Sequence, residues 1–300
     1  MKVAIDERPL GSGDAIRGIG VYTRELIEAL KKYKVLSNKE NADIIHFTKF
    51  NPFFISVPFV KPKNKRLVLT IYDLIPLVYP EHYPLGVRGK INFWINKFLI
   101  SKNIDAIITI SETSKKDICR FLGVNPNKVF VTYLAPRKIF KPITDHRSLI
   151  TVRNKYKLPS TFALYVGDVN YNKNIPGLIE MCKNAGIPLV IAGKQAKEVK
   201  DESLNLSHPE LQHLENLDWG DVTALGFVPD EDLVGLYNLA DVYIQPSLYE
   251  GFALPILEAK ACGVWVIATR IQTHVEIMES DRKYSWDKTA KKTLDVYKNC

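Results

Sequence analysis

The stretch that decides the fold covers residues 241–270 and reads DVYIQPSLYEGFALPILEAKACGVWVIATR. Its first part, DVYIQPS, has the short apolar pattern of a buried strand, LPILEAKACG has the pattern of a helix, and VWVIATR is again a strand. A strand, a helix and a strand in this order predict a βαβ unit, in which the two strands lie parallel in one sheet. We therefore expect an α/β protein whose parallel sheets are covered by helices on both faces.

The same alternation continues through the rest of the chain and falls into two consecutive halves. The first half has strand patterns at residues 2–6, 42–47, 66–73 and 105–111, and it closes with VFVTYLAP. The second half restarts with FALYVG and continues through PLVIAG and TALGFV. We predict two Rossmann-like domains facing across a cleft, with residues 1–145 in the first and residues 146–283 in the second.

Several helix ends can be predicted from local signals. A glycine loop that ends at Gly20 precedes the helix pattern VYTRELIEALKKY. Ser111 is placed to cap the N-terminus of the helix ETSKKDICRFLG, and Gly123 is placed to end it.

The end of the second half is shorter than this pattern requires. After Ile267 a Rossmann-like half normally continues with another strand and one or two helices, but only the amphipathic helix WDKTAKKTLDVYK remains. We predict a shortened C-terminal domain in which some apolar core surface is exposed.

The composition is that of an ordinary globular protein of 300 residues, with 46% apolar and 25% charged residues. The four cysteines form no C-x-x-C pair and have no histidine at ligand spacing, so we expect reduced thiols rather than a zinc site or disulfides. The N-terminus lacks the pattern of a secretory signal, and the most apolar run, INFWINKFLI, is amphipathic. These features predict a cytoplasmic protein that does not cross a membrane.

The net charge of +8 is unevenly distributed. Residues 1–145 contain 24 Lys and Arg against 13 Asp and Glu, whereas residues 146–300 contain 17 against 20. The basic half is suited to anionic lipid headgroups at the inner face of a membrane or to an acceptor that carries phosphate; a merely solvated basic surface is the alternative. Nucleic acid is not an expected partner, because no binding module is present and the lysines are not interleaved with stacking aromatics.

The candidate site with the strongest signal lies where the strand DVYIQPS gives way to the next helix. Glu250 and Gly251 follow the strand at the edge of the sheet where α/β proteins bind ligands. Glu258 lies eight residues later in the helix, so the two carboxylates can bracket one ligand, and a carboxylate suits a ribose diol. The helix N-terminus favours a phosphate. The alternative is that Glu250 only complements the helix dipole and Glu258 is solvated.

This E-x7-E pattern within EGFALPILEAKACG resembles the donor-site motif of family 4 retaining glycosyltransferases, which have the two-domain GT-B architecture. The resemblance implies that Glu250 contacts the transferred sugar and that Glu258 binds the nucleotide ribose. The family motif often has glycine where Ala253 stands. The backbone expected to surround the donor is that of Gly251, Phe252, Ala253 and Leu254.

A second segment, YVGDVNYNKN, resembles the diphosphate-binding loop of the same family. The resemblance implies that Lys173 neutralises the leaving diphosphate, with Gly167 and Asn174 beside it. Many relatives have an arginine directly after the glycine, where this chain has Asp168. A surface lysine in a turn is the alternative.

Two segments of the first half also match the family. The loop before the first helix, which begins at Arg17 and continues through Gly18, Ile19 and Gly20, resembles its N-terminal glycine loop and is expected to approach phosphate or the acceptor. The stretch IYDLIPLVYPEH resembles a segment of bacterial mannosyltransferase-like members, in which histidine usually occupies the position of Tyr72. We retain Asp73 as a catalytic candidate.

The sequence D-E-D at residues 230–232 spells an acid-x-acid pattern that could hold a metal, but it opens an amphipathic helix, where acids favour the dipole and Asp230 can cap. We therefore predict no metal site. The flanking GFVPD resembles the base-contacting segment of the family, which implies that the backbone of Phe227 and Val228 faces the nucleobase.

Together these resemblances imply a metal-independent hexosyltransferase with no cofactor other than its co-substrate, a nucleotide diphosphate sugar. The expected reaction transfers a hexose, with mannose the leading candidate, to a saccharide or lipid-linked acceptor during surface polysaccharide synthesis. Residues 284–300 resemble the last helix of the family, which packs back on the first domain. Two alternatives remain open: a nucleotide-sugar epimerase of similar fold, and a nucleotide-sugar-binding protein without catalytic activity.

Overall fold

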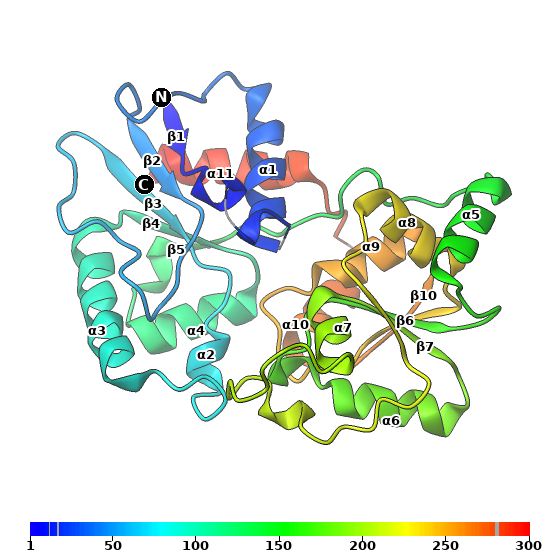
Figure 1. Cartoon of the computed structure of the whole chain (residues 1–300). Helices are drawn as coiled ribbons and strands as arrows, with labels where there is room; N and C mark the ends of the chain where they lie inside the picture. Colours follow the sequence, from blue (N-terminus) through cyan, green and yellow to red (C-terminus); the bar gives the residue numbers. More distant parts are fainter. Residues whose placement is uncertain (12, 17, 280–281) are drawn as a thin grey trace. The chain divides into compact units, whose positions relative to one another are not determined.

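The computed structural model describes residues 1–11, 13–16, 18–279 and 282–300. The chain forms two compact units (Figure 1). Unit 1 comprises Met1–Pro80, Pro84–Ala135 and Ser280–Cys300, and unit 2 comprises Glu81–Tyr83 and Pro136–Glu279. Each unit is built around one parallel five-stranded sheet, which confirms the predicted α/β class.

The sheet of unit 1 has its strands in sequence order, β1-β2-β3-β4-β5. Its strands are β1 (Val3–Ile5), β2 (Ile44–Phe47), β3 (Arg66–Thr70), β4 (Ala106–Thr109) and β5 (Val129–Val131). Most strand residues are buried and the others are half-buried, because helices cover a parallel sheet on both faces.

The helices of unit 1 are α1 (Gly18–Lys31), α2 (Ile75–Val78), α3 (Gly86–Asn103), α4 (Glu112–Leu122) and α11 (Trp286–Asn299). Short 3-10 turns occupy Arg8–Gly11, Gly13–Ile16 and Pro126–Lys128. The ends predicted for α4 are confirmed: the Ser111 hydroxyl accepts a hydrogen bond from the Ser114 N–H at 3.0 Å, and Gly123 ends the helix at φ 67°.

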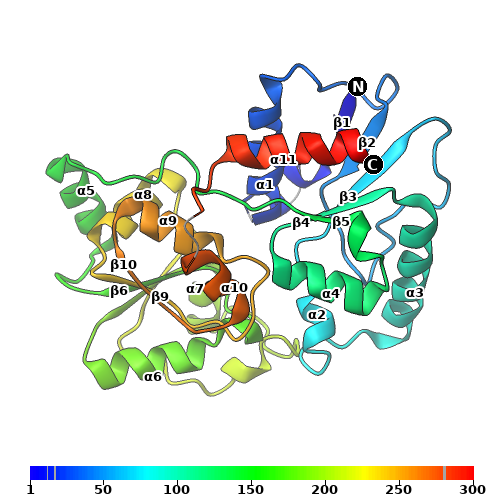
Figure 2. The same ribbon diagram turned by 180° about the vertical axis from the view of Figure 1, so that it is seen from behind.

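The C-terminal helix α11 packs against α1 in unit 1 (Figure 2). The Tyr297 hydroxyl lies 2.6 Å from Nδ1 of the buried His46 on β2, and the Thr289 hydroxyl donates to the Tyr133 carbonyl at 2.6 Å. Buried Trp286 packs near the ring of Tyr22 on α1. The two ends of the chain therefore share one core.

The sheet of unit 2 has the order β10-β9-β6-β7-β8. Its strands are β6 (Ala163–Val166), β7 (Leu189–Ala192), β8 (Thr223–Gly226), β9 (Val242–Gln245) and β10 (Trp265–Ala268). The chain enters at β6, moves outward to β8, and returns to β9 on the other side of β6. The neighbouring strands β6 and β9 thus mark the point where strand order reverses, and ligands bind at the carboxyl ends of strands at such points.

The helices of unit 2 are α5 (His146–Tyr156), α6 (Ile175–Ala185), α7 (Lys194–Lys200), α8 (Asp230–Leu239), α9 (Leu254–Cys262) and α10 (Gln272–Met278), with 3-10 turns at Tyr171–Lys173 and Gln212–Leu214. Two helices, α10 and α11, follow Ile267, so the prediction of a single remaining helix was wrong. Among the described strands β10 pairs only with β9, and Trp265 on it is 82% exposed.

Candidate functional site

The loops that follow β6 and β9 are joined directly at the point where strand order reverses. The Asn172 side-chain amide donates to the Tyr249 carbonyl at 3.0 Å, and the Leu248 N–H donates to the Asn172 carbonyl at 2.8 Å. The carboxyl ends of two adjacent parallel strands bring these loops together, although their residues lie more than seventy positions apart in the sequence. Side chains from both loops can therefore act on one ligand.

An ion pair between Lys173 and Glu250 lies at this junction. The Lys173 ammonium donates to Oε1 and Oε2 of Glu250 at 2.7 and 2.9 Å. The Glu250 side chain is buried, whereas the Lys173 side chain is 23% exposed. The structure thus brings two of the three predicted catalytic residues together, with the lysine reachable from solvent.

Glu250 is fixed in place by three further hydrogen bonds. Oε1 accepts from the Gln245 amide at 2.9 Å and from the Ser247 hydroxyl at 2.7 Å, and the Glu250 carbonyl accepts from the Thr273 hydroxyl at 2.7 Å. None of these three residues was predicted from the sequence. Gln245 and Ser247 are two positions apart at the end of a strand, so they share a face, and this spacing is the signal that could have found them.

The turn that carries Lys173 has a constrained backbone. Asn174 is left-handed, with φ 52°, at the start of α6, and its amide lies 3.4 Å from the Pro246 carbonyl. The Gly167 carbonyl approaches Gly193 so closely that a Cβ on Gly193 would lie 2.1 Å away. Both predicted neighbours of Lys173 therefore shape the loop through the backbone, and Gly193 is a further residue that this packing requires.

The segment Glu81–Tyr83 packs against the same turn within unit 2. The ring of His82 stacks on Tyr171, with ring centroids 3.3 Å apart, and the Tyr83 hydroxyl donates to the Asn172 side-chain oxygen at 3.1 Å. These contacts lie directly before Lys173 and support the turn that presents it.

Ala253 lies between the two glutamates in a left-handed conformation, with φ 68° and ψ 58°, and occupies the N-cap position of α9 without a side-chain cap. This geometry explains why the family motif favours glycine at this position. Pro255 has no N–H, and the Ile256 N–H donates to the Ala253 carbonyl at 3.1 Å. The helix start therefore offers fewer N–H groups to a phosphate than the sequence suggested, while its dipole remains.

Glu258 is buried rather than solvated, so the alternative that it is an exposed helix residue is excluded. The Tyr237 hydroxyl donates to Oε2 at 3.4 Å, and the Arg137 guanidinium lies 3.6 Å from Oε1. Burial raises the pKa of Glu258 to about 7, although Arg137 lowers it and Asp230 raises it further. This carboxyl group therefore titrates near neutral pH.

Buried polar residues connect Glu258 with Glu250. The ring of Tyr237 lies against that of Tyr243, with centroids 5.6 Å apart, and the Tyr243 hydroxyl donates to Gln245, which in turn bonds to Glu250. We refer to Lys173, Glu250 and Glu258 as the carboxyl-edge cluster. Its members come from the loops that follow β6 and β9 and from the helix that follows β9.

Buried His274 on α10 lies near the cluster and was also missed by sequence reasoning. Its Nδ1 donates to the Thr269 carbonyl at 2.8 Å, which leaves Nε2 as an acceptor that has no hydrogen-bond partner among the described residues. Burial lowers the pKa of His274. The hydrogen bond with the Thr269 carbonyl and the charge of Glu250 raise this pKa, and the charge of Lys173 lowers it. The imidazole is therefore expected to be neutral at physiological pH.

Two models of known protein families match this chain. Residues 150–296 match the family model described as Glycosyl transferases group 1, and residues 22–135 match the model described as Glycosyltransferase Family 4. The chain belongs to this glycosyltransferase family. The matched residues include the whole carboxyl-edge cluster and most of unit 1.

Two curated members of the family from Escherichia coli are similar over 71% of this chain. Serotype-specific mannosyltransferase WbdA is 30% identical over 220 residues, and O-antigen chain mannosyltransferase B is 31% identical over 221 residues. The aligned part makes up 26% of the first relative and 55% of the second, so this chain matches only part of each.

Solved structures show the same fold. HepE of Anabaena, solved in complex with UDP-glucose, aligns with 99% of this chain and 89% of its own at a TM-score of 0.63 and 16% identity. Sucrose-phosphate synthase from Thermosynechococcus elongatus aligns with 98% of this chain and 73% of its own at a TM-score of 0.57 and 18% identity. The fold class predicted from the sequence, GT-B, is confirmed.

The segment that resembles the base-contacting part of the family follows β8, at the carboxyl edge of the sheet that carries the cluster. Phe227 is exposed and Val228 is buried. Their contact with a nucleobase stays a prediction.

The family-matching residues of unit 1 have structural partners of their own. Gly18, Ile19 and Gly20 form the first turn of α1, so the prediction that they belong to a loop was wrong, and Arg17 lies outside the described residues. The Tyr72 hydroxyl donates to the Thr48 carbonyl at 2.7 Å, and an Asp73 carboxylate oxygen accepts from the Ile75 N–H at 3.1 Å. The roles of these residues toward an acceptor stay predictions.

The acid-x-acid pattern at the start of α8 is engaged in ion pairs. Asp230 pairs with Arg137, and Asp232 accepts from the Lys155 ammonium at 2.5 Å and the Tyr156 hydroxyl at 2.7 Å. Pro229, not Asp230, occupies the cap position, so the capping role predicted for Asp230 was wrong. In the described ranges, His, Cys, Asp and Glu side chains do not gather in groups of three that could hold a metal ion.

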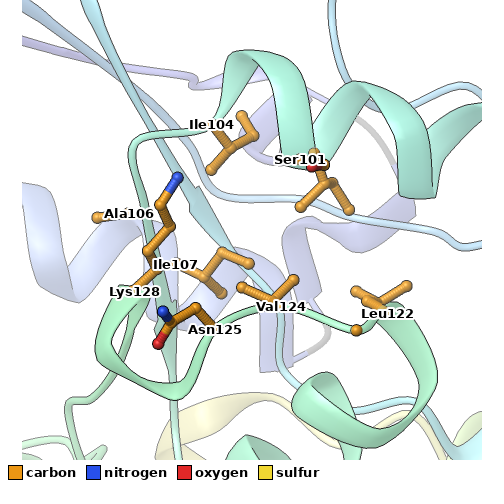
Figure 3. Close-up of a pocket in the computed structure, with 10 residues that line it drawn as sticks. Ser101, Ile104, Ala106, Ile107, Leu122, Val124, Asn125 and Lys128 are labelled. Carbon is orange, nitrogen blue, oxygen red and sulfur yellow. The ribbon is translucent and has the colours of Figure 1, made fainter.

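A cavity of about 230 Å³ lies elsewhere, in unit 1 between the ends of α3 and α4 (Figure 3). Its lining is formed by Ile100, Ser101, Ile104, Ala106, Ile107, Leu122, Gly123, Val124, Asn125 and Lys128. The carboxyl-edge cluster contributes no residue to it.

Of the helices in the described part of the chain, none combines the length and apolar character that crossing a bilayer requires.

Proposed function

We propose that this protein is a retaining glycosyltransferase that moves a hexose from a nucleotide diphosphate sugar to a saccharide or lipid-linked acceptor in cell-surface polysaccharide synthesis. The observation that carries the proposal is the Lys173–Glu250 ion pair at the reversal point of the unit 2 sheet, at 2.7 Å. The names of the Escherichia coli relatives favour mannose as the hexose. We take a guanosine diphosphate sugar as the first donor to test.

The proposed chemistry assigns one role to each member of the cluster. Lys173 neutralises the diphosphate as the bond between the sugar C1 and the phosphate oxygen breaks. Glu250 orients the sugar hydroxyls, and Glu258 accepts hydrogen bonds from the nucleotide ribose. The acceptor hydroxyl forms the new bond to C1 on the face that the diphosphate leaves, and its proton passes to the departing phosphate oxygen. The configuration at C1 is therefore retained.

The charge of Lys173 and the dipole at the start of α9 serve where other transferases use a divalent cation. We propose that the reaction requires no metal ion and no cofactor beyond the sugar nucleotide. We also propose that the protein works at the inner face of a membrane and contacts anionic lipid through the basic unit 1, since a lipid-linked acceptor would be held there.

To test this proposal, the protein is incubated with a panel of labelled nucleotide sugars, with and without acceptor, and the product that carries the label is identified. Label that appears in the acceptor, with chelator present, supports the proposal. Label that appears in an epimerised nucleotide sugar would indicate an epimerase, and nucleotide binding without turnover would indicate a binding protein; either result would overturn the proposal.

A substitution assigns the chemistry to the cluster. We expect Lys173→Ala to lower turnover at least about 100-fold, because electrostatic stabilisation of the leaving group is lost while the fold is retained. Lys183→Ala removes an exposed lysine from α6 of the same unit and is the matched control. Equal turnover in the two variants would remove Lys173 from the mechanism.

A further inference from the structure

The helix α3 of unit 1 exposes a row of large apolar side chains. Val87, Ile91, Trp94 and Phe98 are 78%, 55%, 65% and 63% exposed. Their spacing of three and four residues places them in one stripe along the helix. We call these four residues the outer face of α3.

The outer face is not the side of α3 that packs on the core. Leu99 and Ile100 are buried in the core that includes the sheet of unit 1. Asn96 is also buried, and its amide donates to the Phe54 carbonyl at 2.7 Å in the neighbouring loop. The helix is therefore apolar on two opposite sides, and among the described residues the outer face stays exposed while the side with Leu99 and Ile100 is buried. Contiguous exposed apolar surface of this kind marks an interaction site in proteins that must stay soluble.

Basic residues border the outer face. The helix contains Arg88, Lys90, Lys97 and Lys102 and has neither Asp nor Glu. The Lys97 ammonium lies 5.2 Å from the centre of the Trp94 ring, and the Lys102 ammonium lies 5.8 Å from that of Phe98. Aromatic and aliphatic residues between flexible lysines are the pattern of helices that lie in a membrane interface.

The loop at residues 51–60 lies beside α3 and extends the exposed apolar surface of this part of unit 1. Its residues Phe54, Phe59 and Val60 are exposed, and Asn103 of α3 donates to the Pro58 carbonyl at 2.7 Å. The helix lies along the margin of unit 1, on the side away from α1 and α11 (Figures 1 and 2). A planar surface can therefore reach the outer face without displacing either helix.

We propose that the outer face of α3 inserts into the interface of a bilayer that contains anionic phospholipid. The apolar side chains would enter the boundary between headgroups and acyl chains, while the lysines remain at the level of the phosphates. A second copy of this chain fits less well, because a two-fold contact through this helix would place basic borders against each other. The inference rests on the membrane contact proposed above for unit 1 and names the surface that makes it. Vesicle binding can be measured without any transfer reaction, so failure of this inference and failure of the proposed activity are distinguishable.

The test measures binding of the full chain to vesicles by co-sedimentation. We expect binding to vesicles of phosphatidylcholine with phosphatidylglycerol and weak binding to phosphatidylcholine alone. Replacing both Trp94 and Phe98 by Ser should lower the partition coefficient at least about ten-fold, because the apolar anchor is lost. Ile150→Ser, which removes an exposed apolar residue from α5 of unit 2, is the matched control and should bind as the wild type does.

A second variant keeps the test decisive if the double variant folds poorly. Trp94→Phe preserves an apolar side chain, so it should bind vesicles as the wild type does but lose most of the fluorescence quenching that brominated lipids cause. Absence of vesicle binding by the wild type, or unchanged quenching in Trp94→Phe, would overturn the proposal. So would concentration-dependent dimerisation that the Ser variants abolish, because it would assign the outer face to a second copy.

Discussion

Ala253 shows how one side chain adapts to a backbone that the site requires. Its φ of 68° places a Cβ-bearing residue in the left-handed region, which costs an L-residue roughly 1–2 kcal/mol. Its backbone bend sets the direction in which the chain continues from Glu250 into α9. The chain therefore tolerates strain at the point where the family motif often has glycine.

This strain leads to a prediction about Ala253→Gly. We expect the variant to be more stable by about 0.5–1 kcal/mol, because the relief of the left-handed strain exceeds the greater entropy of glycine in the unfolded chain. Urea unfolding measures the difference. A variant that is less stable than the wild type would show that the left-handed conformation is not strained here.

Glu258 leads to a prediction about pH. Its pKa in the folded protein, about 7, lies above the value of 4.5 expected when the chain is unfolded. The contribution of its protonated form to stability is therefore fully present below pH 4.5 and is lost as the pH rises through about 7. In Glu258→Gln the side chain stays neutral throughout.

We therefore expect Glu258→Gln to gain stability relative to the wild type by about 2 kcal/mol between about pH 5 and about pH 8. The free energy of unfolding in urea at the two pH values gives this difference. A gap between variant and wild type that stays constant across the range would show that Glu258 ionises normally in the folded protein.

The site residues that lie in local motifs could be predicted from the sequence. The site residues that are defined by tertiary contacts could not. Lys173, Glu250 and Glu258 lie in segments with a recognisable strand, turn and helix pattern. Arg137 could not be assigned, because its partner Glu258 lies over one hundred residues away and only the fold brings them together. Arg137 also pairs with Asp230, and which acids share one guanidinium depends on tertiary packing that no local pattern encodes.

At the scale of elements, the strands were predictable because buried parallel strands are short, continuous apolar runs. Helix starts were less so. The pattern placed Gly18 and Gly20 in a loop, but glycine in the first turn of a helix costs little when the rest of α1 buries Tyr22, Leu26 and Leu30. Packing of the apolar face therefore extended this helix beyond the boundary that propensity indicates.

The edge strand β10 leads to a prediction about solubility. Trp265 is exposed on this strand, and exposed apolar edges promote association between chains. We expect Trp265→Lys to change the free energy of unfolding by less than about 0.5 kcal/mol and to reduce self-association. Light scattering over a range of protein concentrations measures the second effect. Unchanged scattering would show that the edge does not drive association.

At the scale of the whole molecule, α11 makes unit 1 depend on both ends of the chain. Trp286 is buried at the start of α11, near Tyr22 of α1. We expect Trp286→Ala to lower the stability of unit 1 by about 3–5 kcal/mol, because a large buried side chain leaves a cavity. The stability of unit 2 should not change.

Limited proteolysis with mass spectrometry separates the two units. In Trp286→Ala, cleavage within unit 1 should accelerate while cleavage within unit 2 stays at the wild-type rate. The control is Trp265→Ala, which removes an exposed tryptophan from unit 2. Equal protection of unit 1 in both variants would contradict the role given to α11.

The division into two α/β halves followed from the repeated strand and helix rhythm, whereas strand order did not. Both sheets arise from similar alternations, yet unit 1 keeps sequence order and unit 2 reverses between β8 and β9. The reversal depends on which side of β6 the chain returns to, and no local pattern records this choice. It is also what joins Lys173 to Glu250.

The most direct test of the carboxyl-edge cluster as a donor site is calorimetric titration of the wild type and Lys173→Ala with guanosine and uridine diphosphates. We expect one nucleotide to bind the wild type and to bind the variant at least about ten-fold more weakly, a loss of about 1.4 kcal/mol. Equal affinity in the two proteins, or no binding of either nucleotide to the wild type, would contradict the account.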